Sequence, residues 1–172
     1  LDARKMYGIP TSAPLFLFVG RLMQERGPDL LLEAVPFVVK AWTDAYFIFA
    51  GAGFLKGSLE RRAAELAVES SVMFIKAPKT GSRELQALLD ACDALVVPSR
   101  CDDFGLTILE GWAAAKPVVA TSCGEHSHLV RHDLDGFLVD QEPGSIAWGI
   151  CKISESRDHA RQMGEEGQKR AR

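Results

Sequence analysis

Short runs of branched and aromatic apolar residues recur along the chain, and a segment of helical character follows each of them. Strands are predicted over residues 15–19, 46–50, 72–75, 95–97, 118–120 and 136–139. Helices are predicted over residues 28 to about 40, 59–69, 82–91, 106–115 and the tail 143–172, in which Trp148, Ile153 and Met163 are expected to be buried. Uninterrupted apolar runs indicate strands that are covered on both faces. Their alternation with helices predicts βαβ units, and hence a three-layer α/β/α fold with a parallel sheet of about six strands.

Composition sets few limits beyond this fold class. The 172 residues are 47% hydrophobic and 25% charged, which suits one globular core. The net charge of -3 argues against a general nucleic-acid surface. No apolar run is long enough for a spanning helix, and residues 1–10 lack the apolar region of a signal peptide.

The cysteines and the first residues give two further expectations. Four scattered cysteines without a Cys-x-x-Cys motif (Cys92, Cys101, Cys123 and Cys151) indicate reduced thiols and a cytoplasmic protein. Residues 1–14 end in a Pro-Thr-Ser-Ala-Pro run typical of linkers, so the predicted domain covers residues 15–172. Because the chain does not begin with Met, we expect a domain taken from a longer protein.

Residues 95–120 carry the strongest functional pattern: a buried strand, a polar loop, a helix and a second buried strand. The loop brings Asp102, Asp103 and Gly105 to the carboxyl end of the first strand, where open α/β sheets bind ligands. Glu110 is the one carboxylate in an otherwise apolar helix, with no basic residue within four positions. It could accept hydrogen bonds from a vicinal diol such as that of ribose. One of the two aspartates, Asp103, is expected to cap the helix instead.

A second pattern follows the first strand. Gly20 and Arg21 come directly after it, and Arg26 precedes the next helix. Two guanidinium groups beside a helix start suit a pyrophosphate. The alternative is that Arg21 pairs with a surface carboxylate and Arg26 is solvated.

Two other patterns are weaker. Gly51-Ala52-Gly53 follows a strand but lacks the remaining features of a dinucleotide-binding loop, so a tight turn is favoured. His126, His128 and His132 lie close in sequence, but their spacing matches no metal-ligand set, and no metal site is predicted.

Taken together, FVGRL, ERG, GAG, PSRCDDFGLTILEGWAAAKPVVAT and HDLDGFLV resemble the donor-binding half of retaining glycosyltransferases of family four. The resemblance runs from about Leu15 to the end of the chain. It implies one Rossmann-like half of a GT-B enzyme, which transfers a sugar from a nucleoside diphosphate sugar to an acceptor with retention of configuration. It also implies that a second, acceptor-binding domain belongs to the same polypeptide and is absent here. No metal or other cofactor, nucleic acid or membrane contact is implied, except for a membrane contact made through that other domain.

The resemblance also implies roles for individual residues. Arg21 and Arg26 match the pair that holds the donor diphosphate, with Gly20 allowing close backbone approach. Glu110 matches the carboxylate that binds ribose, and Asp102 matches the one that contacts the donor sugar. The remaining donor-binding residues are Phe104, Gly105, Leu106 and Thr107 at the helix start, and Lys76 near the base.

The sequence departs from the family pattern at several positions. Asp102 is one methylene shorter than the usual Glu, and Arg26 replaces Lys. Glu125 and His128 stand where Gly and Glu are common. Two alternatives therefore stay open: a non-catalytic nucleotide-binding or scaffold domain with this fold, and a sugar-nucleotide epimerase domain. If the chain is the donor-binding domain of a glycosyltransferase, we expect the isolated domain to bind a nucleotide without turnover.

Overall fold

The computed structural model describes residues 1–101 and 105–172. Among these residues, six parallel strands form one sheet in the order β3-β2-β1-β4-β5-β6. The strands are β1 (Leu15–Val19), β2 (Tyr46–Ala50), β3 (Val72–Ile75), β4 (Ala94–Val97), β5 (Val118–Thr121) and β6 (Gly136–Val139). The expected Rossmann-like α/β architecture is confirmed, and the strand positions follow the apolar runs in the sequence.

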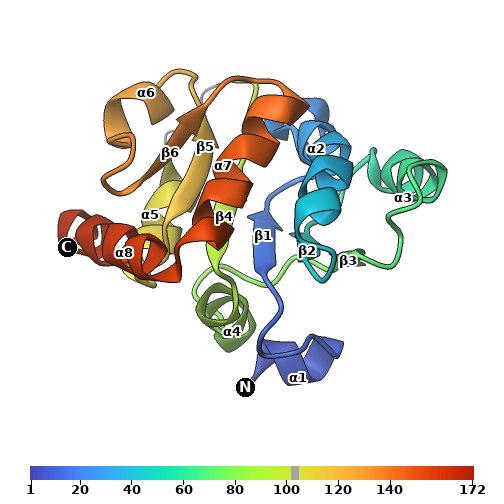
Figure 1. Cartoon of the computed structure of the whole chain (residues 1–172), viewed down its shortest axis with the longest axis horizontal. Helices are drawn as coiled ribbons and strands as arrows, with labels where there is room; N and C mark the ends of the chain where they lie inside the picture. The colour runs from blue at the N-terminus through green and yellow to red at the C-terminus, as the bar shows by residue number, and fades with distance from the viewer. Residues whose placement is uncertain (102–104) are drawn as a thin grey trace.

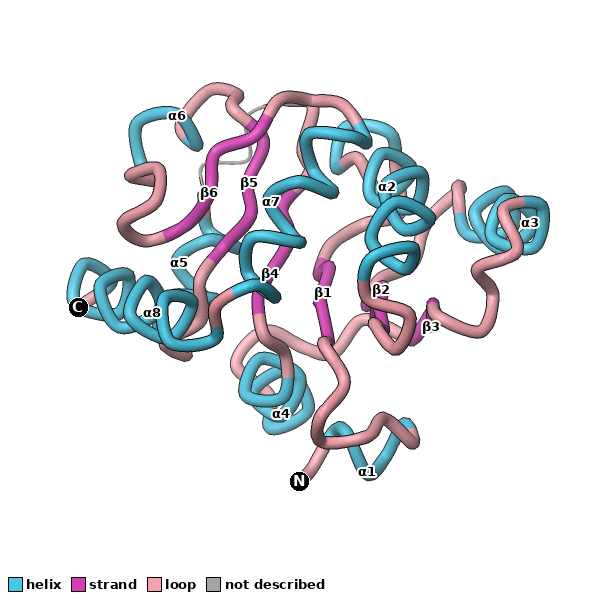
Figure 2. The backbone as a smooth tube through the Cα atoms, viewed as in Figure 1, coloured by secondary structure: helices cyan, strands magenta, loops and turns pink. Residues whose placement is uncertain are grey.

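The helices cover both faces of this sheet (Figures 1 and 2). In chain order they are α1 (Ala3–Tyr7), the 3-10 turn η1 (Gln24–Arg26), α2 (Pro28–Ala41), α3 (Lys56–Glu65), α4 (Arg83–Ala91), α5 (Leu106–Ala113), α6 (His126–Leu129), α7 (Pro143–Glu155) and α8 (Arg157–Ala171). None of the described helices is long and apolar enough to cross a membrane.

Alternation along the strands divides the core into two layers. Phe16, Phe47 and Phe49 point to the face covered by α2 and α7, which lie side by side in Figure 1. Leu17 and Leu95, from β1 and β4, point to the opposite face and pack against α4 and α5. Successive strand residues face opposite sides, so strands buried on both faces must be apolar at every position.

Two helices end earlier than predicted, and for the same reason. Helix α3 stops at Glu65 because Ala67 adopts φ 56°, while the amide of Val68 donates to the carbonyl of Ala63. Helix α5 stops at Ala113 because Ala115 adopts φ 58°. Such left-handed endings usually carry glycine, so an alanine there gives no signal in the sequence.

The C-terminal part of the chain differs from the prediction in two respects. The continuous helix predicted over 143–172 is two helices, because Ser156 is extended and its side chain caps α8 by accepting a hydrogen bond from the amide of His159. The prediction that Trp148 is buried is wrong, since 45% of the side chain is exposed. The buried face of α7 is formed by Ile146, Ile150 and Ile153, and Trp148 lies about 200° around the helix from Ile146 by the 3.6-residue period.

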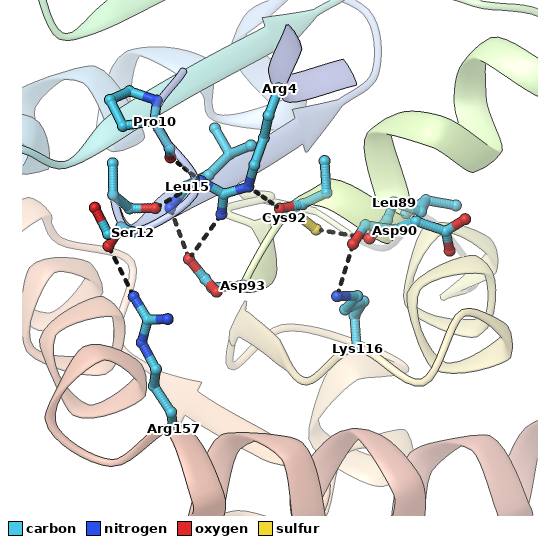
Figure 3. Close-up of polar contacts among 12 residues, drawn as sticks. Arg4, Pro10, Ser12, Leu15, Leu89, Asp90, Cys92, Asp93, Lys116 and Arg157 are labelled. Carbon is cyan, nitrogen blue, oxygen red and sulfur yellow. Dashed lines mark hydrogen bonds and ion pairs between the residues drawn. The ribbon is translucent and has the colours of Figure 1, made fainter. Parts of the chain in front are cut away.

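Residues 1–14 pack against the body of the domain. The Arg4 guanidinium donates to the carbonyls of Pro10 (2.7 Å), Ala13 (2.8 Å) and Ala91 (3.1 Å) and lies 3.5 Å from Asp93 (Figure 3). Ala3 and Ile9 are buried in the same core layer as α4. The first segment is thus part of the packed structure.

Candidate functional site

The strand order predicts a crevice between the loops that follow β1 and β4. These strands are neighbours, with Phe16 beside Ala94 and Leu17 beside Leu95. From β1 the chain passes through α2 to β2, on one side of the β1–β4 pair. From β4 it passes through α5 to β5, on the other side of the pair, and α5 covers the face of the sheet opposite to α2. Ligands of open α/β sheets bind where the strand order reverses in this way. The two sequence patterns centred on Arg21 and Glu110 therefore meet at the same edge of the sheet.

The loop after β1 is fixed by its backbone. The amide of Gly20 donates to the carbonyl of Ala50 (3.2 Å), and the amide of Leu22 donates to that of Ala52 (2.9 Å). Leu22 is fully buried, while Arg21 between these anchors is exposed. Arg21 forms no hydrogen bond or ion pair with any residue that the structure describes. The alternative of a surface carboxylate partner for Arg21 is therefore not observed.

The Gly51–Ala52–Gly53 segment packs against this loop, and the turn itself follows at Phe54 and Leu55 rather than within the three residues. A Cβ on Gly51 would lie 1.8 Å from the carbonyl oxygen of Gly20, and one on Gly53 would lie 2.5 Å from that of Leu22. Backbone contact this close requires glycine. Beside the turn lies a hollow of about 460 Å³ whose lining includes Gly20, Arg21, Met23, Phe54 and Ala77.

A second set of contacts joins the loops after β1 and β4. Arg100 donates to the carbonyl of Gln24 (2.7 Å) and to both carboxylate oxygens of Asp29 (2.8 and 2.7 Å). Its amide donates to the carbonyl of Glu25 (2.8 Å), and the Asp29 carboxylate raises the pKa of Arg100. Sequence analysis missed this arginine, although its place three residues after a buried strand was a signal. Arg100 fixes the segment that carries the half-buried Arg26.

Helix α5 begins at the crevice. Gly105 is its N-cap residue, with φ 69°. The prediction that Asp103 caps this helix falls on a residue outside the described ranges. A Cβ on Gly105 would lie 2.6 Å from Leu129. The amides of Leu106 and Thr107, in the first turn, have no intrahelical acceptor. The predicted site residues Asp102 and Phe104 lie outside the described residues.

Glu110 lies one turn further along α5. It is half-buried, and the loss of solvation raises the pKa of its carboxyl above the usual range. Its carboxylate forms no hydrogen bond or ion pair with the described residues. A desolvated carboxylate without a partner is unfavourable in the free protein and is available to a ligand that donates hydrogen bonds.

Lys76, one of the predicted site residues, lies away from this crevice. It is exposed after β3 and lines a separate hollow of about 210 Å³ with Tyr7 of α1 and Glu84 of α4. Its neighbour Ala77 lines the hollow beside Arg21.

A polar cluster missed by sequence analysis joins the ends of β4 and β5. His126 is fully buried, with Nδ1 3.0 Å from the carbonyl oxygen of Thr121. The Thr121 hydroxyl donates to the carbonyls of Val97 and Ser99. In the described part of the chain, no group of three His, Cys, Asp or Glu side chains is placed to hold a metal. His126 therefore braces the strand ends.

Relatives of known sequence share this domain. The chain is 31% identical over 154 residues to an uncharacterized glycosyltransferase of Methanocaldococcus jannaschii, covering 89% of this chain and 39% of that protein. It is 34% identical over 172 residues to the D-inositol 3-phosphate glycosyltransferase of Corynebacterium urealyticum, covering 95% and 40%. The chain thus spans about two fifths of the length of these relatives.

Solved structures share the fold. HepE of Anabaena, solved in complex with UDP, superposes with a TM-score of 0.88 at 23% identity, covering 98% of this chain and 46% of that one. The C-terminal domain of the group 1 glycosyl transferase LpcC from Francisella tularensis gives 0.85 at 22% identity, covering 96% and 87%. Residues 2–170 match the family described as glycosyl transferases group 1. The chain therefore belongs to the group 1 glycosyltransferase family.

Proposed function

We propose that this domain binds the nucleoside diphosphate sugar of a retaining glycosyltransferase, in the crevice between the loops after β1 and β4. The observation that carries the proposal is that Arg21, on the loop after β1, and Glu110, on the helix that follows the β4 loop, have no partner among the described residues. An exposed guanidinium suits a diphosphate, and a half-buried carboxylate suits the two hydroxyls of ribose.

Each group then has a definite task in transfer. Arg21 and Arg26 neutralise the charge that develops on the leaving diphosphate, together with the first-turn amides of α5. Glu110 orients the nucleoside through its ribose, Asp102 contacts the donor sugar, and the backbone at Gly20 and Gly105 allows close approach. Because the arginines supply the positive charge, transfer by this scheme needs no divalent cation.

Two comparisons support this proposal. HepE was solved with UDP and with UDP-glucose. The Corynebacterium urealyticum relative is a D-inositol 3-phosphate glycosyltransferase. The remaining part of such a protein would supply the acceptor site, so we expect the isolated domain to bind a nucleotide diphosphate without transferring sugar.

Arg21→Ala should weaken binding of the preferred nucleoside diphosphate about 10- to 100-fold, since charge-assisted hydrogen bonds contribute roughly 1.5–3 kcal/mol each. Calorimetric titration of UDP, GDP and ADP into the wild-type domain identifies the base, and the variant is then titrated with that nucleotide and its monophosphate. The monophosphate should lose much less affinity. Arg83→Ala, an exposed arginine at the start of α4, is the matched control. Absence of heat with all three diphosphates in the wild type would favour a scaffold domain.

Glu110→Gln should weaken the same nucleotide about tenfold, because a neutral amide is a poorer acceptor for the ribose diol. Wild-type affinity should fall as the pH is lowered through the raised pKa of Glu110, while the affinity of the variant stays flat there. A 2′,3′-dideoxy nucleotide should bind both proteins alike. If Glu110→Gln lost as much affinity for the dideoxy nucleotide as for the ribonucleotide, the ribose contact would be contradicted.

The same substitution should stabilise the free domain. Burial raises the folded-state pKa of Glu110, so the protonated form contributes stability that is complete below the unfolded pKa and lost as pH rises through the folded pKa. Glutamine removes that loss, so the melting temperature should exceed that of the wild type at pH 7 and match it at low pH. Each kcal/mol gained corresponds to about 2–4 °C for a domain of this size.

A further inference from the structure

A cavity of about 350 Å³ lies at the amino edge of the sheet, opposite the edge where the donor crevice lies. Its walls come from segments far apart in the sequence: the lead-in to β1, the turn before β2, the residues before β4 and β5, and the junction of α7 with α8. Cavities of this volume are in the range of small-molecule sites. The proposed nucleotide function does not use this cavity.

Positive charge predominates around the cavity. Lys116, Arg157 and Arg161 line it, against the two carboxylates Asp44 and Asp93. One of these carboxylates is already engaged, because Asp93 accepts the amide of Leu15 (2.8 Å) and lies 3.5 Å from Arg4. Figure 3 shows Asp93, Lys116 and Arg157 around this region. The lining thus carries an excess of cationic groups.

The cations retain donors for a ligand. Arg157 uses Nη2 to donate to the carbonyl of Ser12 (2.9 Å), and Lys116 donates to the carbonyl of Asp90 (3.0 Å). An arginine has five N–H donors and a lysine three, so each keeps others. Arg161 is 69% exposed and lies 3.8 Å from Asp158.

Ser154 gives a second, independent observation. This residue of α7 lines the cavity, and its Oγ is buried without a hydrogen-bond partner. Buried hydroxyls are almost always paired with protein or with a bound molecule. Trp42 and Ile153 supply apolar surface in the same lining.

We propose that the cavity binds a small organic anion with an oxyanion head and a compact apolar body. Arg157 and Arg161 hold the oxyanion, and the body packs against Trp42 and Ile153. A carboxylate is planar and a phosphate is tetrahedral, but each presents two oxygens that a guanidinium can bind together. This site is separate from the donor crevice, so occupation of one leaves the other accessible.

The test is an NMR titration of the ¹⁵N-labelled domain with three probes: benzoate, inorganic phosphate and benzamide. Benzoate should give saturable shifts at the amides of Ser154, Arg157 and Trp42, while phosphate, which lacks the apolar body, and benzamide, which lacks the charge, bind at least tenfold more weakly. Phosphate binding as tightly as benzoate would overturn the apolar half of the proposal. Equal binding of benzamide, or no saturable shift with any probe, would overturn the anion site.

Variants locate the site. Arg157→Gln and the surface change Arg161→Glu should each weaken benzoate at least tenfold, and Arg83→Glu on α4 is the control. Arg161 lies on the solvent side, so its replacement tests the site even if Arg157→Gln disturbs the fold. Nucleotide affinity should be unchanged in all three variants. Benzoate affinity unchanged in both cavity variants would place the ligand elsewhere and end the proposal.

Discussion

Replacing Trp112 with alanine should lower the free energy of unfolding by about 3–5 kcal/mol, the range for truncating a large buried aromatic side chain. Trp112 is fully buried on α5, and its Nε1 donates to the carbonyl of Asp135 (2.9 Å). The Arg170 guanidinium lies 5.0 Å from the indole ring centroid, and a Cβ on Gly167 would lie 2.1 Å from the ring. The variant therefore loses core packing, a hydrogen bond and the surface on which α8 rests.

The melting temperature of the Trp112 variant should fall by roughly 6–20 °C, at about 2–4 °C per kcal/mol. Trp148→Ala is the matched control, because this second tryptophan is 45% exposed and the loss of its contacts with His132 and Phe137 should cost only about 1–2 kcal/mol. Equal losses in the two variants, measured by urea unfolding, would show that burial of Trp112 is not what stabilises α5 and α8.

Gly27→Ala should destabilise the domain by about 2–5 kcal/mol and weaken nucleotide binding as well. Gly27 has φ 70°, a conformation that costs an alanine about 1–2 kcal/mol. A Cβ there would also lie 1.9 Å from the carbonyl oxygen of Pro98, so the loops after β1 and β4 would have to separate, at a further cost of about 1–3 kcal/mol. Because Arg26 precedes this glycine, the separation would displace a proposed diphosphate ligand.

Gly8→Ala separates the cost of the left-handed backbone conformation from the cost of the collision with Pro98. Gly8 has φ 68° but nothing within 4 Å of its Cβ position, so its replacement carries the backbone strain without the collision. We expect a loss of about 1–2 kcal/mol and unchanged nucleotide affinity for this control. If Gly27→Ala behaved like Gly8→Ala in both measurements, the two loops would not be held as closely as the structure indicates.

The fold was predictable because its signals are local. Each strand is buried on both faces and is therefore an unbroken apolar run, and Ser82 at the start of the predicted 82–91 helix caps α4 by accepting the amide of Leu85 at 3.2 Å. The errors arose where a tertiary contact overrides a local signal. Ala115 can end α5 in a left-handed conformation because Gly164 of α8 packs against its carbonyl group, which no pattern in residues 106–115 reveals.

The candidate site was predictable to the level of its loops. Arg21 stood out as a charge directly after an apolar strand and Glu110 as the one carboxylate of an apolar helix, and strand order then placed both segments at one edge. Arg100 was missed because its importance depends on Asp29, 71 positions away in the chain. His126 was noted only as one of three histidines close in sequence, because its bracing role depends on the folded strand ends that surround it.

The anchoring of Arg4 bears on where the folded unit begins. A boundary drawn at the first strand would discard this guanidinium, and the carbonyls of Pro10, Ala13 and Ala91 that it bridges would lose their common donor. Asp93 would lose its neighbouring cation at the same time. The packed unit consequently reaches back through α1, and a shortened chain starting at Leu15 would bare the side of α4 that this helix now shields.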